Sequence, residues 1–133
     1  MFAARVRYLA VLGGVCIISV ACSSSSEPPT SCRAGATVVV SVSASATPEF
    51  TWSPDCLVYR LEVSASGSEN VTWWIEGTIP SGVRYGEAPA GATGMAAEPL
   101  VRGRAYTVAV LRLGADAESN FYETLGYKDF VQR

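Results

Sequence analysis

From residue 37 onward, hydrophobic and polar residues alternate along the chain with a period of two. This is the repeat of β-strands that bury one face and expose the other. Turn-forming residues separate the alternating runs, and no window offers a long amphipathic helix with caps. Strands are therefore predicted over residues 37–45, 49–53, 57–66, 70–77 and 103–113, with one bent strand or two short ones over 121–131.

The same alternation predicts which side chains face the core. Arg60, Glu62 and Ser64 are expected to point outward, toward solvent. The inward set consists of Val38, Val40, Val42, Phe50, Trp52, Leu57, Tyr59, Leu61, Val63, Tyr106, Val108 and Val110. Short strands separated by turns at this spacing predict an all-β domain built as a sandwich.

Trp73 and Trp74 are adjacent in the strand predicted over 70–77, so their rings point to opposite faces. Burying one ring tends to expose the other. An exposed tryptophan beside Tyr85 or another aromatic residue is a candidate contact for a sugar or a protein partner. The favoured alternative is that both rings are packed because the strand over 71–75 is curled or covered at its edge, or that the second ring is covered by residues 86–98.

Residues 1–21 have the layout of an export signal. Arg5 and Arg7 precede a nearly uncharged apolar run over 8–20, which is too short for a comfortable membrane span, and small residues follow. Removing the signal removes Cys16, two arginines and no acid, and so moves the formal net charge from −2 to −4. The remaining basic residues are scattered and outnumbered by acids, so we expect no nucleic-acid partner.

The composition also narrows the chemistry that the chain can perform. It contains no histidine, which removes the usual nucleophile–base triads and most zinc sites. Glu62 and Glu76 can approach each other on neighbouring strands, but exposed acids on the solvent face of a sheet are the favoured interpretation. We therefore expect no catalytic residue, metal or cofactor, and a protein that is not an enzyme.

Three cysteines remain after the export signal, an odd number for an exported protein. Cys32 and Cys56 fall in or beside the folded region, and export to an oxidising compartment favours a disulfide between them. Cys22 is then left over and needs another role. The stretch that follows it, SSSSEPPTS over 23–31, has no apolar anchor and is typical of an open tether, about 25–30 Å long when extended.

Ser19-Val20-Ala21-Cys22, followed by serines, resembles the lipobox of bacterial lipoproteins, although that motif usually has leucine where Ser19 stands. The resemblance implies that Cys22 carries a diacylglyceryl group and becomes the acylated N-terminus of a membrane-anchored envelope protein. Serine after the cysteine favours the outer membrane in an organism that has one. The same small residues also fit ordinary signal cleavage, which would leave Cys22 as a free thiol of a secreted or periplasmic protein.

Leu100, Gly103 and Tyr106, followed by alternating valines, resemble the entry to strand F of a fibronectin type III domain. The stretch FTWSPDCLVYRLEV, from residue 50, is similar to that family's strand B tryptophan, proline-rich turn and strand C tyrosine. The matching blocks cover roughly 38–63 and 100–113. The resemblance implies an all-β fold with a single antiparallel β-sandwich, fibronectin III/immunoglobulin-like, of about seven strands.

The same resemblance implies three local features. The Tyr106 ring is expected at one end of the sandwich, buried, with its hydroxyl bonded to nearby backbone, an arrangement called a tyrosine corner. Residues 93–98 are expected to occupy the place of strand E or, because their β-propensity is poor, to form an ordered loop over the sheet face. The start of strand A and the turn after strand B share one end, which brings Cys32 and Cys56 together, and closing that loop contributes about 3 kcal/mol.

The chain is thus expected to comprise an export signal (1–21), a tether (22–31) and a sandwich domain (32–133). Its expected role is that of a non-catalytic module that contacts a protein partner in the envelope or gives structural support, while its N-terminal lipid contacts the membrane. The alternative is a carbohydrate-binding module that stacks an exposed tryptophan on a glycan.

Overall fold

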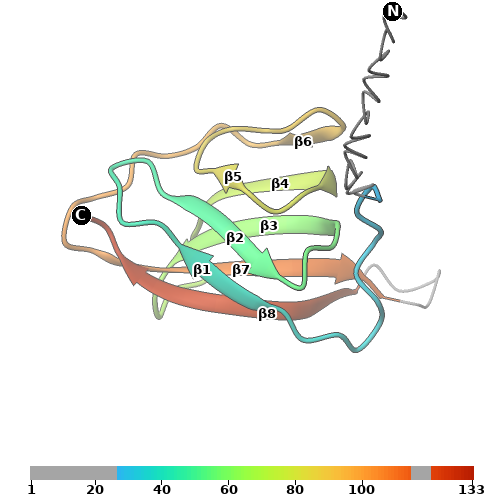
Figure 1. The fold of residues 1–133 in the computed structure, drawn as a ribbon. Helices are drawn as coiled ribbons and strands as arrows, with labels where there is room; N and C mark the ends of the chain where they lie inside the picture. Colours follow the sequence, from blue (N-terminus) through green and yellow to red (C-terminus); the bar gives the residue numbers. More distant parts are fainter. Residues whose placement is uncertain (1–26, 115–120) are drawn as a thin grey trace, which may run out of the picture.

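In the part of the chain that the structure describes, eight β-strands form two antiparallel sheets that face each other as a sandwich (Figure 1). The computed structural model describes residues 27–114 and 121–133, and these residues contain no helix. The predicted export signal, Cys22 and the first part of the tether lie outside the described residues. The prediction of an all-β antiparallel sandwich is confirmed, with eight strands in place of about seven.

The smaller sheet has the strand order β1-β2-β5, and the larger sheet has the order β6-β4-β3-β7-β8. All pairings between neighbouring strands are antiparallel. The strands are β1 (Val39–Val42), β2 (Glu49–Ser53), β3 (Val58–Ala65), β4 (Val71–Ile79), β5 (Val83–Arg84), β6 (Ala92–Gly94), β7 (Ala105–Leu113) and β8 (Tyr122–Val131).

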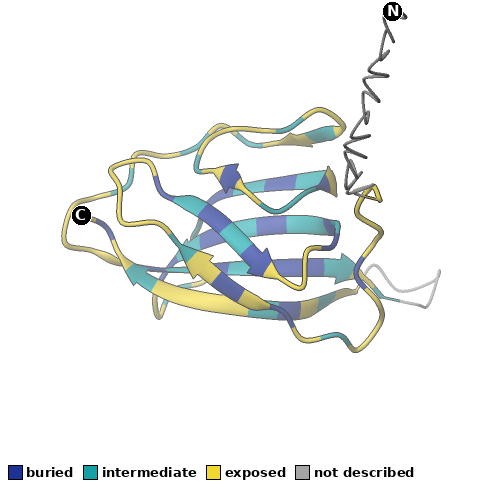
Figure 2. Cartoon of the chain, viewed as in Figure 1, coloured by how far each residue is buried: buried dark blue, intermediate teal, exposed yellow. Residues whose placement is uncertain are grey.

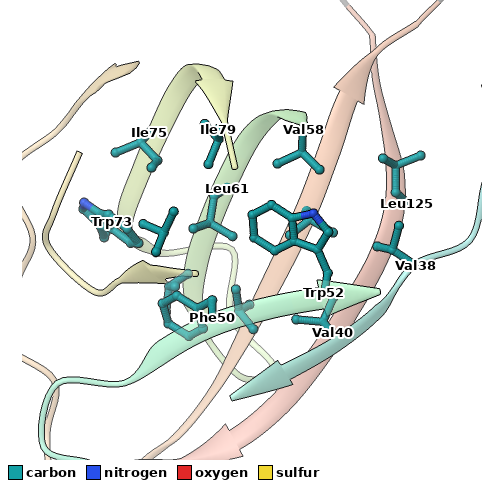
Figure 3. Packing of buried hydrophobic residues seen from close by; sticks show 14 of the residues in the cluster. Val38, Val40, Phe50, Trp52, Val58, Leu61, Trp73, Ile75, Ile79 and Leu125 are labelled. Carbon is teal, nitrogen blue, oxygen red and sulfur yellow. The ribbon is translucent and has the colours of Figure 1, made fainter. Parts of the chain in front are cut away.

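The hydrophobic core fills the space between the two sheets. Phe50 and Trp52 of β2 enter it from the smaller sheet, and Leu61, Trp73 and Ile75 enter it from the larger sheet (Figure 3). Buried and more exposed positions alternate along β2, as a period of two requires (Figure 2). The inward prediction is confirmed at Val38, Val40, Phe50, Trp52, Leu61, Val63, Tyr106, Val108 and Val110, while Val42 is half-buried against the core.

The inward prediction is wrong at the start of β3. Leu57 and Tyr59 are only half-buried, and Val58, which is 2% exposed, takes the core position between them. The pairing of β3 with β4 shifts between Val58 and Arg60, and such a bulge takes one residue out of the regular alternation. The Tyr59 ring stacks instead on the ring of Tyr122, with 6.3 Å between their centroids.

Residues 121–131 form one bent strand, β8, rather than two short ones. Leu125 is the unpaired residue of a bulge where β8 pairs with β7, and it is 3% exposed. Its carbonyl oxygen accepts a hydrogen bond of 3.0 Å from the backbone N–H of Val38, which ties the two sheets together at this edge. Gly126 permits the approach, because a Cβ atom there would clash with the Val38 carbonyl oxygen.

Replacing Gly126 with alanine is therefore expected to lower the free energy of unfolding by about 2 kcal/mol or more, since the clash is with backbone that cannot turn aside. Urea unfolding followed by circular dichroism measures the loss. Gly67→Ala is the control, because Gly67 has a φ of 72° but no heavy atom within 4 Å of the added Cβ. This variant should lose only about 1 kcal/mol of unfolding free energy, which is the cost of placing alanine in the left-handed region. Equal losses for the two variants would contradict the close approach at Gly126.

The tyrosine corner is confirmed. The Tyr106 side chain is 1% exposed, and its hydroxyl oxygen accepts a hydrogen bond of 2.9 Å from the backbone N–H of Val101. The ring also stacks on Phe130, with centroids 5.8 Å apart. The hydroxyl thus holds the segment before β7 against a buried side chain of β7 itself.

The expectation that residues 93–98 fill the place of strand E is wrong. Strand E of an immunoglobulin-like sandwich lies in the same sheet as strand B, whereas β6 is the edge of the larger sheet, beside β4. The strand next to β2 is β5, which places the buried Val83 opposite Phe50. Small residues explain the difference: Gly94 packs so closely on β4 that a Cβ atom would clash with the Trp74 carbonyl oxygen.

The Sγ atoms of Cys32 and Cys56 lie 1.97 Å apart, so the predicted pair is at disulfide-bonding distance. Backbone bonds reinforce the junction: the Cys32 N–H donates to the Leu57 carbonyl at 2.9 Å, and the Leu57 N–H donates to the Thr30 carbonyl at 2.8 Å. The described part of the tether is therefore fixed to the start of β3. This junction and the C-terminus lie at opposite ends of the sandwich (Figure 1).

Candidate binding surface

The two adjacent tryptophans lie on opposite sides of β4, as predicted. Trp73 is 1% exposed and packs between the sheets, with its ring 6.3 Å from that of Phe50 and 5.1 Å from that of Tyr85. The Tyr85 hydroxyl donates to the Glu98 carbonyl at 2.6 Å, and burial raises the pKa of its phenol. Trp74 is half-buried on the outer face of the larger sheet. Tyr85 therefore accompanies the buried tryptophan.

Trp74 belongs to a compact group of side chains on this outer face. The guanidinium carbon of Arg60 lies 4.7 Å from the centroid of the Trp74 ring and 5.1 Å from that of Tyr122. Tyr59 extends the stack through its contact with Tyr122. With two acidic residues these side chains form what we call the Trp74 cluster, which comprises Tyr59, Arg60, Glu62, Trp74, Glu76 and Tyr122.

Arg60 brings Glu62 and Glu76 together, so the two acids meet on neighbouring strands. Its Nε lies 2.8 Å from Oε2 of Glu62, and its Nη1 lies 2.5 Å from Oε1 of Glu76. The Tyr122 hydroxyl donates to the same oxygen of Glu76. One guanidinium and two carboxylates leave the cluster with one net negative charge. The Glu62 and Glu76 side chains keep 28% and 23% of their surface exposed.

These contacts shift the pKa values of the groups involved. The hydrogen bond from Tyr122, followed by that from Arg60, lowers the pKa of Glu76 against the opposing effect of burial. The same bond raises the pKa of Tyr122, because losing the phenolic proton would remove it. Burial works against the charge of Arg60, but its hydrogen bonds to Glu62 and Glu76 outweigh burial and raise its pKa.

The lowered pKa of Glu76 predicts a dependence of stability on pH. A carboxyl group whose pKa is lower in the folded state adds stability above its unfolded pKa and loses it as the pH falls through the folded value. We therefore expect acidification below about pH 4.5 to remove this contribution. Glu76→Gln, which cannot titrate, should lose less stability than the wild type over that range in urea unfolding. Identical pH profiles would contradict the assignment.

The strand register places further side chains in line with the cluster. Trp74 lies opposite Glu62, Glu62 lies opposite Ala109, and Ala109 lies opposite Tyr127. Residues directly opposite in antiparallel strands share a face, so these four form one row across β4, β3, β7 and β8. Tyr127 is 68% exposed. The row thus has an aromatic residue at each end and a small residue between Glu62 and Tyr127.

The outer face of the smaller sheet has a different composition. The residues of β1 and β2 that point away from the core carry no aromatic ring, and Val39 is the large hydrophobic among them, 69% exposed. The others are Ser41, Glu49, Thr51 and Ser53. Aromatic side chains on the outer faces of the long strands are therefore concentrated on the larger sheet.

One hollow of the surface borders the Trp74 cluster, because Tyr59 lines it. This open hollow of about 250 Å³ lies beside the disulfide, with Cys32, Tyr59, Arg112 and Leu113 in its lining. Arg112 is paired there with Glu123, with 2.8 Å between Nη1 and Oε2. Within residues 27–114 and 121–133, no three cysteine, aspartate or glutamate side chains are placed to hold a metal ion. The Trp74 cluster offers stacking and hydrogen bonding, which are the chemistry of binding.

No protein family, curated protein or solved structure matches this chain. Across the part of the chain that the structure describes, no helix is long and apolar enough to cross a membrane. The fold and the surface together define an antiparallel β-sandwich with an aromatic–arginine cluster on the outer face of one sheet.

Proposed function

We propose that this chain is a lipid-anchored protein of a bacterial cell envelope, and that its sandwich is a non-catalytic module that binds a partner protein. The binding surface is the outer face of the larger sheet. The Trp74 cluster carries this proposal, because tryptophan, tyrosine and arginine are the residues that dominate the binding energy of protein interfaces. They gather here on one face, while the outward residues of β1 and β2 in the smaller sheet carry no aromatic ring and no arginine.

The anchor in this proposal is a lipid on Cys22, in the outer membrane where the organism has one. Its support is the lipobox-like stretch that ends at Cys22 and the tether that follows. The end of the tether is fixed to the sandwich at Cys32, far from the C-terminus. The tether would thus leave the long faces of the sheets free to meet another envelope protein. The tyrosine corner supports relating the sandwich to the fibronectin type III type.

A binding role without catalysis is supported by how the ionisable groups of the cluster are used. Arg60 is bound by both Glu62 and Glu76, and the Tyr122 hydroxyl donates a hydrogen bond to Glu76. A nucleophile or a general base must be able to exchange a proton with a substrate or a neighbouring group at hydrogen-bond distance. These groups instead hold each other in place, which fixes the ring of Trp74 in a defined orientation.

A glycan is the second candidate ligand, because Trp74 lies beside two carboxylates that can accept hydrogen bonds from sugar hydroxyls. Acrylamide quenching of tryptophan fluorescence, with and without cell-wall polysaccharide, tests it. Trp73 is shielded inside the core, so a glycan that covers Trp74 should reduce the quenchable emission. Emission and quenching that do not respond to any polysaccharide would exclude this candidate.

Photo-cross-linking in intact cells tests the binding of a partner protein. A benzoylphenylalanine in place of Tyr127 reports on the outer face of the larger sheet, and one in place of Val39 serves as a matched control on the smaller sheet. The two positions are 68% and 69% exposed. We expect a discrete cross-linked product from position 127 that is absent or much weaker from position 39. No product from position 127, or equal products from both, would contradict the proposed surface.

A further inference from the structure

We propose that the partner segment bound by the sandwich is cationic, and that one of its guanidinium or ammonium groups lies over Ala109. There it would have the ring of Tyr127 on one side and would pair with Glu62 on the other. This inference rests on the proposed function, because it names the chemistry of the partner that the outer face binds.

The row across the sheet supplies the shape of the site. Neighbouring strands lie about 4.8 Å apart, so Ala109 is one strand from Glu62 and one strand from Tyr127. Its methyl group is the smallest side chain of the row, and it leaves a low floor between longer neighbours. A cation placed on that floor can reach the carboxylate on one side and the ring of Tyr127 on the other. The four strands involved lie side by side in the sheet (Figure 1).

The aromatic ring of Tyr127, at one end of the row, supplies attraction for a cation. The face of a tryptophan or tyrosine ring carries negative partial charge and attracts guanidinium and ammonium groups. The chain already makes this contact within itself, since the guanidinium of Arg60 lies 4.7 Å from the centroid of Trp74. Tyr127, in contrast, is 68% exposed. Its ring remains available to a cation from outside.

The net charge of this outer face also favours a cationic ligand. Among the described strand residues that share it, the one basic side chain is Arg60, and the acids are Glu62, Glu76 and Asp129. Arg60 is bound by Glu62 and Glu76, and Asp129 accepts a hydrogen bond of 2.6 Å from Thr107. The face therefore keeps a negative balance, and 28% of the Glu62 side chain stays open to a second cation.

Binding of a dye-labelled oligoarginine peptide to the full-length protein in detergent micelles tests the inference, with fluorescence anisotropy as the readout. Glu62→Gln should weaken binding about tenfold, since it removes a charged hydrogen-bond partner. Tyr127→Ala should weaken it about threefold through the lost ring. Ala109→Arg should abolish it, because the new guanidinium fills the floor of the site. Glu69→Gln makes the same change of charge on an exposed residue outside the strands and should have no effect.

Three results would overturn the inference. One is that the peptide does not bind, and another is that Glu69→Gln weakens binding as much as Glu62→Gln does, which indicates general charge attraction. The third is that a neutral polysaccharide, and no cationic peptide, protects Trp74 from quenching, which assigns the face to a glycan. If cross-linking from position 127 still captures a protein, the proposed function stands while the cationic site fails. If that cross-linking fails as well, both are wrong.

Discussion

Replacing Trp73 with alanine is expected to lower the free energy of unfolding by about 3–5 kcal/mol. The ring is 1% exposed, lies between the two sheets and contacts Phe50 and Tyr85, so its removal leaves a large cavity that the sheets cannot close. Domains of this size are stable by about 5–15 kcal/mol in total. The substitution therefore removes a large part of the stability of the sandwich.

The neighbouring residue provides the matched control. Trp74→Ala removes a side chain of the same kind from the same strand, but from the outer face, where it contacts Arg60. Its loss is expected to be about 1–2 kcal/mol, from a cation–π contact and partial burial. Urea unfolding of both variants, followed by circular dichroism, measures the difference. Equal losses would contradict the assignment of the two rings to opposite sides of β4.

Cys22→Ala is expected to release the protein from the membrane completely. Two or more acyl chains, at about 0.8 kcal/mol for each buried methylene, hold a protein on a bilayer stably, whereas a bare N-terminus does not. Without the lipid, the sandwich is joined through the Cys32 junction to a tether that has no membrane anchor of its own. The intact mass of the mature protein should lose its acyl increment at the same time.

Cys16→Ala is the control for this experiment, because Cys16 lies within the predicted export signal and is absent from the mature chain. It should leave both the acylated mass and the membrane fraction unchanged. Membrane retention of the Cys22→Ala variant at the wild-type level would rule out the lipid anchor. A wild-type protein that carries no acyl mass and stays in the soluble fraction would support instead a secreted or periplasmic protein with ordinary signal cleavage.

The alternation of hydrophobic and polar residues was sufficient to predict the sandwich and most of its inward faces. It was wrong where the backbone departs from regular pairing. Leu57 and Tyr59 follow the pattern of an inward face, but the bulge between Val58 and Arg60 turns Val58 inward in their place. A bulge depends on two strands rather than one, so a period measured along a single strand does not contain it.

The candidate surface was predictable only in part for the same reason. The outward direction of Arg60 and Glu62 and the opposite directions of the two tryptophans follow from the period of two. The stacking of Tyr122 over Arg60, and the place of Tyr127 in the row, depend on how β8 pairs with β7 around the bulge at Leu125. The cysteine pair was predictable from export and from the place of Cys32 and Cys56 in or beside the folded region, without any knowledge of register.

Cross-linking from position 127 in cells that carry Trp74→Ala tests the binding surface most directly. The variant keeps the core, so its thermal unfolding confirms that the sandwich is intact before the experiment begins. A residue at the centre of an interface typically contributes 2 kcal/mol or more, about thirtyfold in affinity. We predict that the yield of the cross-linked partner falls at least tenfold relative to the same chain with Trp74. An unchanged yield from a folded variant would show that the partner does not bind at the Trp74 cluster.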